Sequence, residues 1–178
     1  MKNFLRALFF VLTAITLACS GAKEAPKTNT SSTNSLYPAW YGGFEFNTDS
    51  TSFFARATAV ADDAETAKLR ADKEARALLE SYIAKELEDI RSELERDGSS
   101  VAKKPDFILM LRNAHYKIEE VATISNLESV ENGGVFRGFA HVVVRKEKVR
   151  SLIETGLSTN SNYQKEFVGS VSFQEFIK

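Results

Sequence analysis

Cysteine is nearly absent from this 178-residue chain, in which Cys19 stands alone. One cysteine cannot form an internal disulfide, and it cannot supply the paired thiolates of a structural zinc site. Histidine is also scarce, with only His115 and His141. The chain has no phosphate-binding glycine loop and no calcium-loop spacing. We therefore predict no metal site and no cofactor.

A catalytic pattern is missing as well. The segment GSVSF at 169–173 does not supply the G-x-S-x-G turn that exposes a nucleophilic serine in hydrolases. His141 lies between Phe139 and Val143 in a segment that alternates like a strand, which favours a structural role. A Ser-His-Asp triad has no fixed order along a chain, so that alternative stays open. We predict no catalytic residues and a protein that is not an enzyme.

The chain has no excess of basic residues. Lys and Arg number 23 against 24 Asp and Glu, which gives a formal net charge of −1. Proteins that bind nucleic acid through its phosphates need a basic face. The composition, 43% hydrophobic and 26% charged, is otherwise that of an ordinary globular chain. We predict one folded domain and no nucleic-acid partner.

Long apolar runs are confined to residues 1–18. Lys2 and Arg6 give this segment a positive start, the mostly apolar run ALFFVLTAITLA follows, and small Ala18 precedes a cleavage point. A helix over that run would rise about 18 Å, which is less than the ~30 Å hydrocarbon core of a bilayer. Residues 1–18 are therefore predicted to be a secretory signal peptide.

Cys19 directly follows this run and is predicted to carry a lipid. A free thiol outside the cytoplasm would be open to oxidation. The sequence TLACS resembles the lipobox of bacterial lipoproteins, with Leu17 two residues before the cysteine and Thr16 at the position where leucine is usual. A lipoprotein cysteine carries more than one acyl chain, which makes the anchor firm. The alternatives are a plainly cleaved signal and an uncleaved anchor.

The residues after Cys19 are predicted to be a linker. Ser20 is similar to the pattern that directs lipoproteins to the outer membrane, which is the predicted location. Residues 20–35, SGAKEAPKTNTSSTNS, contain no large apolar side chain and cannot offset the entropy lost on ordering. As a flexible coil this linker spans about 20–24 Å. We thus divide the chain into the lipidated cysteine with its linker, 19–35, and a single domain, 36–178.

The domain is predicted to contain one long helix. Asp62 or Asp63 caps its start, and Glu65 lies three residues after Asp62, as in a capping box. One apolar stripe at helical spacing follows: Ala64, Ala67, Ala71, Ala75, Leu78, Leu79, Tyr82, Ile83, Leu87, Ile90 and Leu94. The alanine half can lie close against a sheet, whereas the larger half needs a wider gap. Asp97-Gly98 ends the helix, and residues 92–97 are expected to overhang the domain or fray.

The other elements are predicted from alternation, turn residues and helical spacing. They are a strand over 52–61, a short helix from Pro105, hairpin strands over 116–130 and 135–145 joined by ENGG, and helices over 146–155 and 161–176. This order predicts an α+β fold in which a small antiparallel sheet packs on one long alanine-rich helix, with short C-terminal helices. The charged residues of the long helix, among them Glu80 and Arg91, are predicted to form a solvated face.

Aromatic residues cluster where the domain begins. Seven lie within residues 37–54: Tyr37, Trp40, Tyr41, Phe44, Phe46, Phe53 and Phe54. One interpretation is a strap that covers the core and seals the sheet. The other is a partly exposed surface that binds a partner, because Tyr and Trp are good interface anchors. Tyr37, Trp40 and Tyr41 are the candidate partner-binding residues.

Three segments, YPAWYGG, ATAVADDAETAKLRADKEARALLESYI and GGVFRGFAHVVVRKEKV, together resemble the LPP-twenty family of bacterial lipoproteins. That family is similar to the amino-terminal domain of a flagellar assembly protein. Pro38 and Trp40, Ala75-Arg76, and Val142 to Arg145 stand at the family's characteristic places, and Lys146 stands where a proline often follows. The resemblance covers about residues 37–155. It implies a small α+β lipoprotein of the outer membrane or cell surface without known catalytic residues.

These features predict a non-enzymatic, lipid-anchored protein of the cell envelope that presents a tethered interaction domain. Its partners are expected to be the membrane, through the lipid on Cys19, and an envelope protein. The alternatives are an assembly factor for a flagellum or other envelope machine, and a small-ligand carrier with a pocket beneath the aromatic strap. A polar cavity near His141 would favour the carrier.

Overall fold

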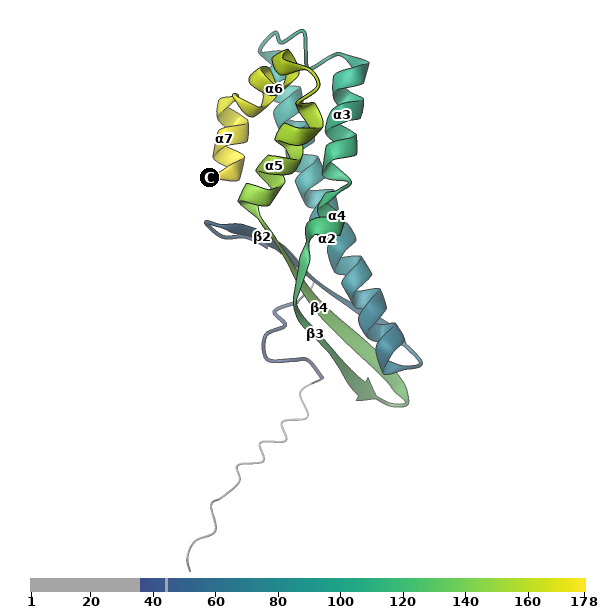
Figure 1. Ribbon diagram of the computed structural model, residues 1–178. Helices are drawn as coiled ribbons and strands as arrows, with labels where there is room; N and C mark the ends of the chain where they lie inside the picture. The colour runs from purple at the N-terminus through teal and green to yellow at the C-terminus, as the bar shows by residue number, and fades with distance from the viewer. Residues whose placement is uncertain (1–35, 44) are drawn as a thin grey trace, which may run out of the picture. The chain divides into compact units, whose positions relative to one another are not determined.

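The computed structural model describes residues 36–43 and 45–178 (Figure 1). The predicted signal peptide, Cys19 and the linker lie outside the described residues, as does Phe44. The strands are β1 (Glu45–Thr48), β2 (Ser52–Ala61), β3 (Thr123–Asn132) and β4 (Val135–Arg145). The helices are α2 (Ala64–Arg96), α3 (Pro105–His115), α4 (Ile118–Val121), α5 (Lys146–Leu157), α6 (Ser161–Val168) and α7 (Val171–Ile177).

The strands form one antiparallel sheet in the order β1-β2-β4-β3, with α2 packed along it. This arrangement confirms the predicted α+β fold. The β3–β4 hairpin turns at Gly133 and Gly134, whose φ angles of 63° and 82° are in the left-handed region that favours glycine. The predicted hairpin is confirmed, but its connection is shorter than predicted, because Glu131 and Asn132 pair with Phe136 and Val135 as part of β3.

The alanine half of α2 lies directly on the sheet, as its small side chains predicted. Ala67, Ala71 and Ala75 are fully buried. A Cβ atom added at Gly138 of β4 would lie 2.1 Å from the carbonyl oxygen of Ala67. Since no side chain fits there, the helix backbone rests on the bare backbone of β4.

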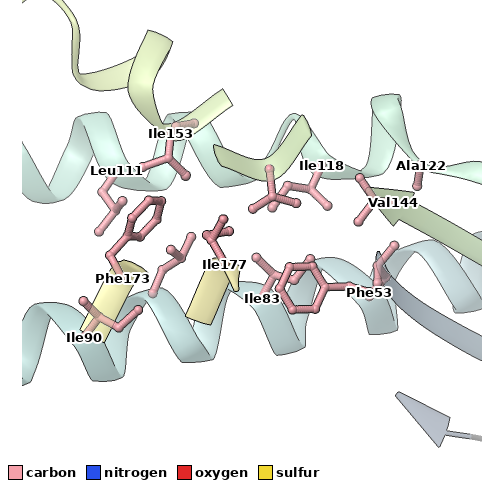
Figure 2. Packing of buried hydrophobic residues seen from close by; sticks show 14 of the residues in the cluster. Phe53, Ile83, Ile90, Leu111, Ile118, Ala122, Val144, Ile153, Phe173 and Ile177 are labelled. Atoms are coloured by element: carbon pink, nitrogen blue, oxygen red, sulfur yellow. The ribbon is translucent and has the colours of Figure 1, made fainter. Parts of the chain in front are cut away.

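The larger half of α2 packs on the other helices (Figure 2). The core residues there come from β2, α2, α3, α4, β4, α5 and α7. Those labelled in Figure 2 are Phe53, Ile83, Ile90, Leu111, Ile118, Ala122, Val144, Ile153, Phe173 and Ile177. The predicted overhang of residues 92–97 is wrong. Arg91 donates to the carbonyl of Ala102 at 2.8 Å, and Ser172 donates to Glu93 at 2.7 Å, so the segments before α3 and at α7 hold this end of α2.

The start of α2 confirms one of the two predicted N-cap residues. Asp63, not Asp62, is the N-cap residue, and its carboxylate accepts from the backbone N–H of Thr66 at 2.8 Å. The capping box between Asp62 and Glu65 is therefore wrong. Glu65 instead pairs with Lys68 one turn later, at 2.5 Å.

Residues 116–122 were predicted to begin a strand but contain the short helix α4. Its helical turn places Ile118 in the core, where it is fully buried. Arg76 of α2 donates to the carbonyls of Glu119 and Ala122, at 2.7 Å each, and so satisfies backbone acceptors at the end of this turn. These long-range contacts favour a helix where local alternation favours a strand.

The C-terminal segment folds as two helices, not one. Ser170 separates α6 from α7 and caps α7, since its hydroxyl accepts from the N–H of Phe173 at 3.2 Å. This break shifts the buried face. Val171 is 73% exposed, whereas Phe173 and Ile177 of the same helix are buried. Within the described part of the chain, no helix is both long and apolar enough to cross a membrane.

Candidate functional site

The first part of the aromatic segment, residues 36–43, lies on the sheet face opposite α2, and from here on only these residues are called the strap. On β4, Gly138 points toward α2, so Phe139 and its alternate neighbours point to the strap. The rings of Tyr37 and Tyr41 contact Phe139 edge-on, with centroids 5.6 and 4.9 Å away. Phe139 is fully buried although it faces away from the main helix. The strap therefore supplies a second, thin aromatic layer.

Trp40 anchors the middle of the strap. A turn, in which the N–H of Tyr41 donates to the carbonyl of Pro38 at 3.0 Å, brings the indole down onto β4. The indole stacks over His141 at 6.3 Å, and its Nε1–H donates to Glu128 of β3 at 2.5 Å. Trp40 and Tyr41 are thus half-buried, whereas Tyr37 remains 45% exposed. The structure brings the three candidate residues together on one face.

Charged and polar groups lie beneath this layer. Arg56 of β2 forms an ion pair with Glu45 of β1 and lies 5.5 Å over the ring of Phe54. Phe54 in turn contacts His141 edge-on at 5.3 Å. The Nε atoms of Arg56 and His141 are buried without a hydrogen-bond partner among the described residues. His141 Nδ1 lies 3.5 Å from the side-chain oxygen of Asn126.

The electrostatics of the site keep its titratable rings neutral. Burial lowers the pKa of His141, and the positive charge of Arg56 lowers it further, while Glu45 opposes them. Burial also raises the pKa of the Tyr41 hydroxyl, with the neighbouring Tyr37 acting in the same direction. At neutral pH the strap thus covers an uncharged imidazole. An uncharged imidazole can be buried under the aromatic rings of the strap without a counter-charge.

The lowered pKa of His141 predicts a pH-dependent stability. An unfolded histidine titrates near pH ~6.5. As pH falls, the unfolded chain therefore takes up a proton on His141 before the folded chain does, which lowers the free energy of unfolding. The contribution of His141 to stability is complete above that pH and is lost between it and the lower pKa of the folded state. Melting temperatures measured from neutral to mildly acidic pH should show this loss. The His141→Gln variant should not show this fall in melting temperature, whereas the His115→Gln variant should still show it. Identical melting profiles for the parent and His141→Gln would contradict the attribution of the fall to His141.

Trp40→Ala is expected to lower the free energy of unfolding by about 2 kcal/mol, because it removes a half-buried ring and its hydrogen bond to Glu128. The more conservative Trp40→Phe keeps a ring over His141 and should lose about 1 kcal/mol. Chemical denaturation measures both. An unchanged midpoint for Trp40→Ala, together with loss of a bound envelope protein, would instead mark Trp40 as an interface residue.

A second polar pair lies between α2 and α3. His115 Nδ1 is 2.5 Å from Glu80 Oε1, and both side chains are only 13% exposed. Glu80 is therefore not part of a solvated face, and neither is Arg91, whose side chain is 12% exposed. A hollow of about 200 Å³ has His115 in its lining, together with Glu88, Arg112 and four apolar residues of α2 and α3.

These helical hollows lie away from the strap. A second one, of about 300 Å³, lies between α3 and α5, and neither it nor the first includes His141. The described residues contain no group of three or more metal-ligating side chains. The polar cavity near His141 that would favour a ligand carrier is thus not among these hollows.

Glu45, Arg56 and Glu128 belong to the site but were not predicted from the sequence. Arg56 stood at an alternate position of a predicted strand, and its pairing with His141 follows only from the β2–β4 register. Glu128 pairs with Phe139 across β3 and β4, and this pairing depends on the position of the hairpin turn. A register fixed from the Gly133-Gly134 turn could have found Glu128.

Comparisons of the chain with protein-family models, with curated proteins and with solved structures found no match. The resemblance to the LPP-twenty family therefore stays a prediction from the three quoted segments.

Proposed function

We propose that this protein is a non-enzymatic, lipid-anchored protein of the bacterial outer membrane, whose folded domain acts as a tethered interaction domain. The observation that carries the proposal is the position of Cys19. The only cysteine of the chain follows an apolar run with a positive start and precedes a polar stretch that leads into the domain. Lipidation uses a single cysteine in this position, whereas an internal disulfide needs two.

The domain supports an interaction role through the strap. Tyr37 and Leu36 expose nearly half of their surface at 45% and 49%, on a segment held by Trp40 and Tyr41. Exposed aromatic and aliphatic side chains on a fixed backbone are good contact residues, because little entropy is lost when they bind. Anchoring would raise the local concentration of this surface near membrane-bound partners.

Proximity labelling in living cells tests this function. A labelling enzyme fused after Lys178 would be compared in the parent chain and in Cys19→Ser, which keeps the same domain. We expect envelope proteins to be enriched around the parent and lost around the variant. An equal set of neighbours for both chains, or none, would contradict a tethered interaction domain. A neighbour set made of flagellar components would favour the assembly-factor alternative.

A further inference from the structure

An apolar patch lies at the hairpin end of the sheet, on the strap face. Its members are Leu36, Tyr37, Val60 and Val135, with exposed fractions of 49%, 45%, 45% and 40%. We call it the hairpin-end patch. Single exposed apolar side chains are common on proteins, but a contiguous group indicates a contact surface.

Arg137 connects the members of the patch. Val60 pairs with Arg137 across β2 and β4, and Val135 stands two residues before it, so all three point to the same sheet face. Arg137 also donates to the hydroxyl of Tyr37 at 3.3 Å and lies 5.7 Å over its ring. Leu36 is the neighbour of Tyr37 along the chain. Tyr37, Val60 and Val135 are therefore grouped around Arg137, and Leu36 adjoins this group through Tyr37.

The chain that leads to the patch indicates what covers it. Leu36 is both a patch member and the first described residue, and residues 20–35 separate it from Cys19. If Cys19 carries the lipid and residues 20–35 behave as the predicted coil, the patch lies on average about 20–24 Å along the linker from the bilayer. A weak surface contact then becomes effective, because the tether makes it an intramolecular event.

The chemistry of the patch fits a bilayer interface. Aliphatic side chains enter the boundary of the acyl chains, while tyrosine and the long side chain of arginine keep their polar ends at the headgroups. The charges near the patch have both signs: Arg70 donates to the carbonyl of Val60 at 3.1 Å, Arg137 lies within the patch, and exposed Asp62 follows Val60 by two residues. Binding therefore depends on apolar contact and not on anionic lipid.

We propose that the hairpin-end patch seats the domain against the bilayer surface that holds its lipid anchor. This inference rests on the lipid anchoring proposed above and names a lipid surface as the partner of the exposed side of Tyr37. One consequence concerns the other end of α2. The segments that hold its last turns, including α7, would point away from the membrane and stay open to protein partners.

The single tryptophan of the chain provides a reporter for this contact. Trp40 lies 5.9 Å from the ring of Tyr41, which stacks at 6.0 Å on Tyr37 of the patch. The full-length lipidated protein would be placed in phosphatidylcholine vesicles that contain a small share of dansyl-headgroup lipid. Energy transfer from Trp40 to dansyl then measures how close the strap face lies to the bilayer.

Two variant sets isolate the patch. The test set is Leu36→Ser, Val60→Ser and Val135→Ser combined; the control set is Leu109→Ser with Val171→Ser, which are 57% and 73% exposed on helices. We expect transfer to fall at least about twofold in the test set and to stay unchanged in the control. Adding anionic lipid or salt should change neither result. Melting temperatures confirm that both variants fold.

Vesicle flotation separates the possible failures. If the parent chain floats with vesicles but both variant sets transfer like the parent, the patch inference is wrong and the anchoring proposal stands. If transfer falls in the test set only because a dimer seen by light scattering is lost, a second copy of the chain covers the patch, which also overturns the inference. If the parent does not float, the anchoring proposal itself fails.

Discussion

Gly138→Ala is expected to lower the free energy of unfolding by at least ~3 kcal/mol, since overpacking against rigid backbone lies at the upper end of such effects. The added Cβ would meet the carbonyl oxygen of Ala67 at 2.1 Å and its carbonyl carbon at 2.3 Å. Backbone atoms cannot rotate away, so α2 would have to lift from β4 along its alanine half. That shift would open the contacts of Ala71 and Ala75 as well.

Thermal and chemical unfolding of the purified domain measure this loss, which corresponds to roughly 10 °C in melting temperature. Gly134→Ala is the matched control. It also replaces a glycine of the hairpin, but a Cβ there has open space and only the positive φ of 82° is strained, so a loss of about 1 kcal/mol is expected. If Gly138→Ala melts as the parent does, α2 is not seated on β4 through Ala67.

Cys19→Ser is expected to move the protein from the membrane fraction to the released fraction almost completely. Each buried methylene of an acyl chain contributes about 0.8 kcal/mol to membrane binding, so two or more chains hold a protein firmly and their loss removes nearly all of the affinity. The serine hydroxyl has nearly the shape of the thiol but does not accept the lipid. Fractionation of cells, followed by a high-salt wash of the membranes, gives the readout.

The double variant Cys19→Ser with Ser31→Cys is the control for this experiment. It restores one thiol to the chain, but places it in the predicted linker and away from the apolar run. It should be released like the single variant, because lipid attachment depends on the signal junction and not on a free thiol. Membrane retention of Cys19→Ser through the salt wash would instead favour an uncleaved apolar anchor.

The main elements of the fold could be predicted because their signals are local. The alternation of residues 52–61, the alanine spacing of α2 and the Gly133-Gly134 turn each depend on neighbouring residues. The short strand β1 was missed because four residues after Gly43 give too little alternation to detect. Helix α4 was missed because its stability depends on Arg76, which is distant in the sequence.

The candidate site could be predicted only in part. The aromatic clustering identified Tyr37, Trp40 and Tyr41, but not what lies beneath them. Those partners are set by the strand register: β2 places Arg56 beside His141, and β3 places Glu128 where it accepts from the indole N–H of Trp40. Similarly, the helical charge pattern could not show that Glu80 turns toward His115 on a helix later in the chain. Such pairs form across elements, and local sequence carries no signal for them.

Mass spectrometry of the mature amino terminus tests the lipid anchor most directly. The protein would be extracted from membranes, digested, and searched for the peptide that begins at Cys19. We predict that this peptide is the amino terminus and carries acyl chains on its sulfur. An intact peptide that joins Ala18 to Cys19, or an amino-terminal Cys19 without added mass, would contradict the account.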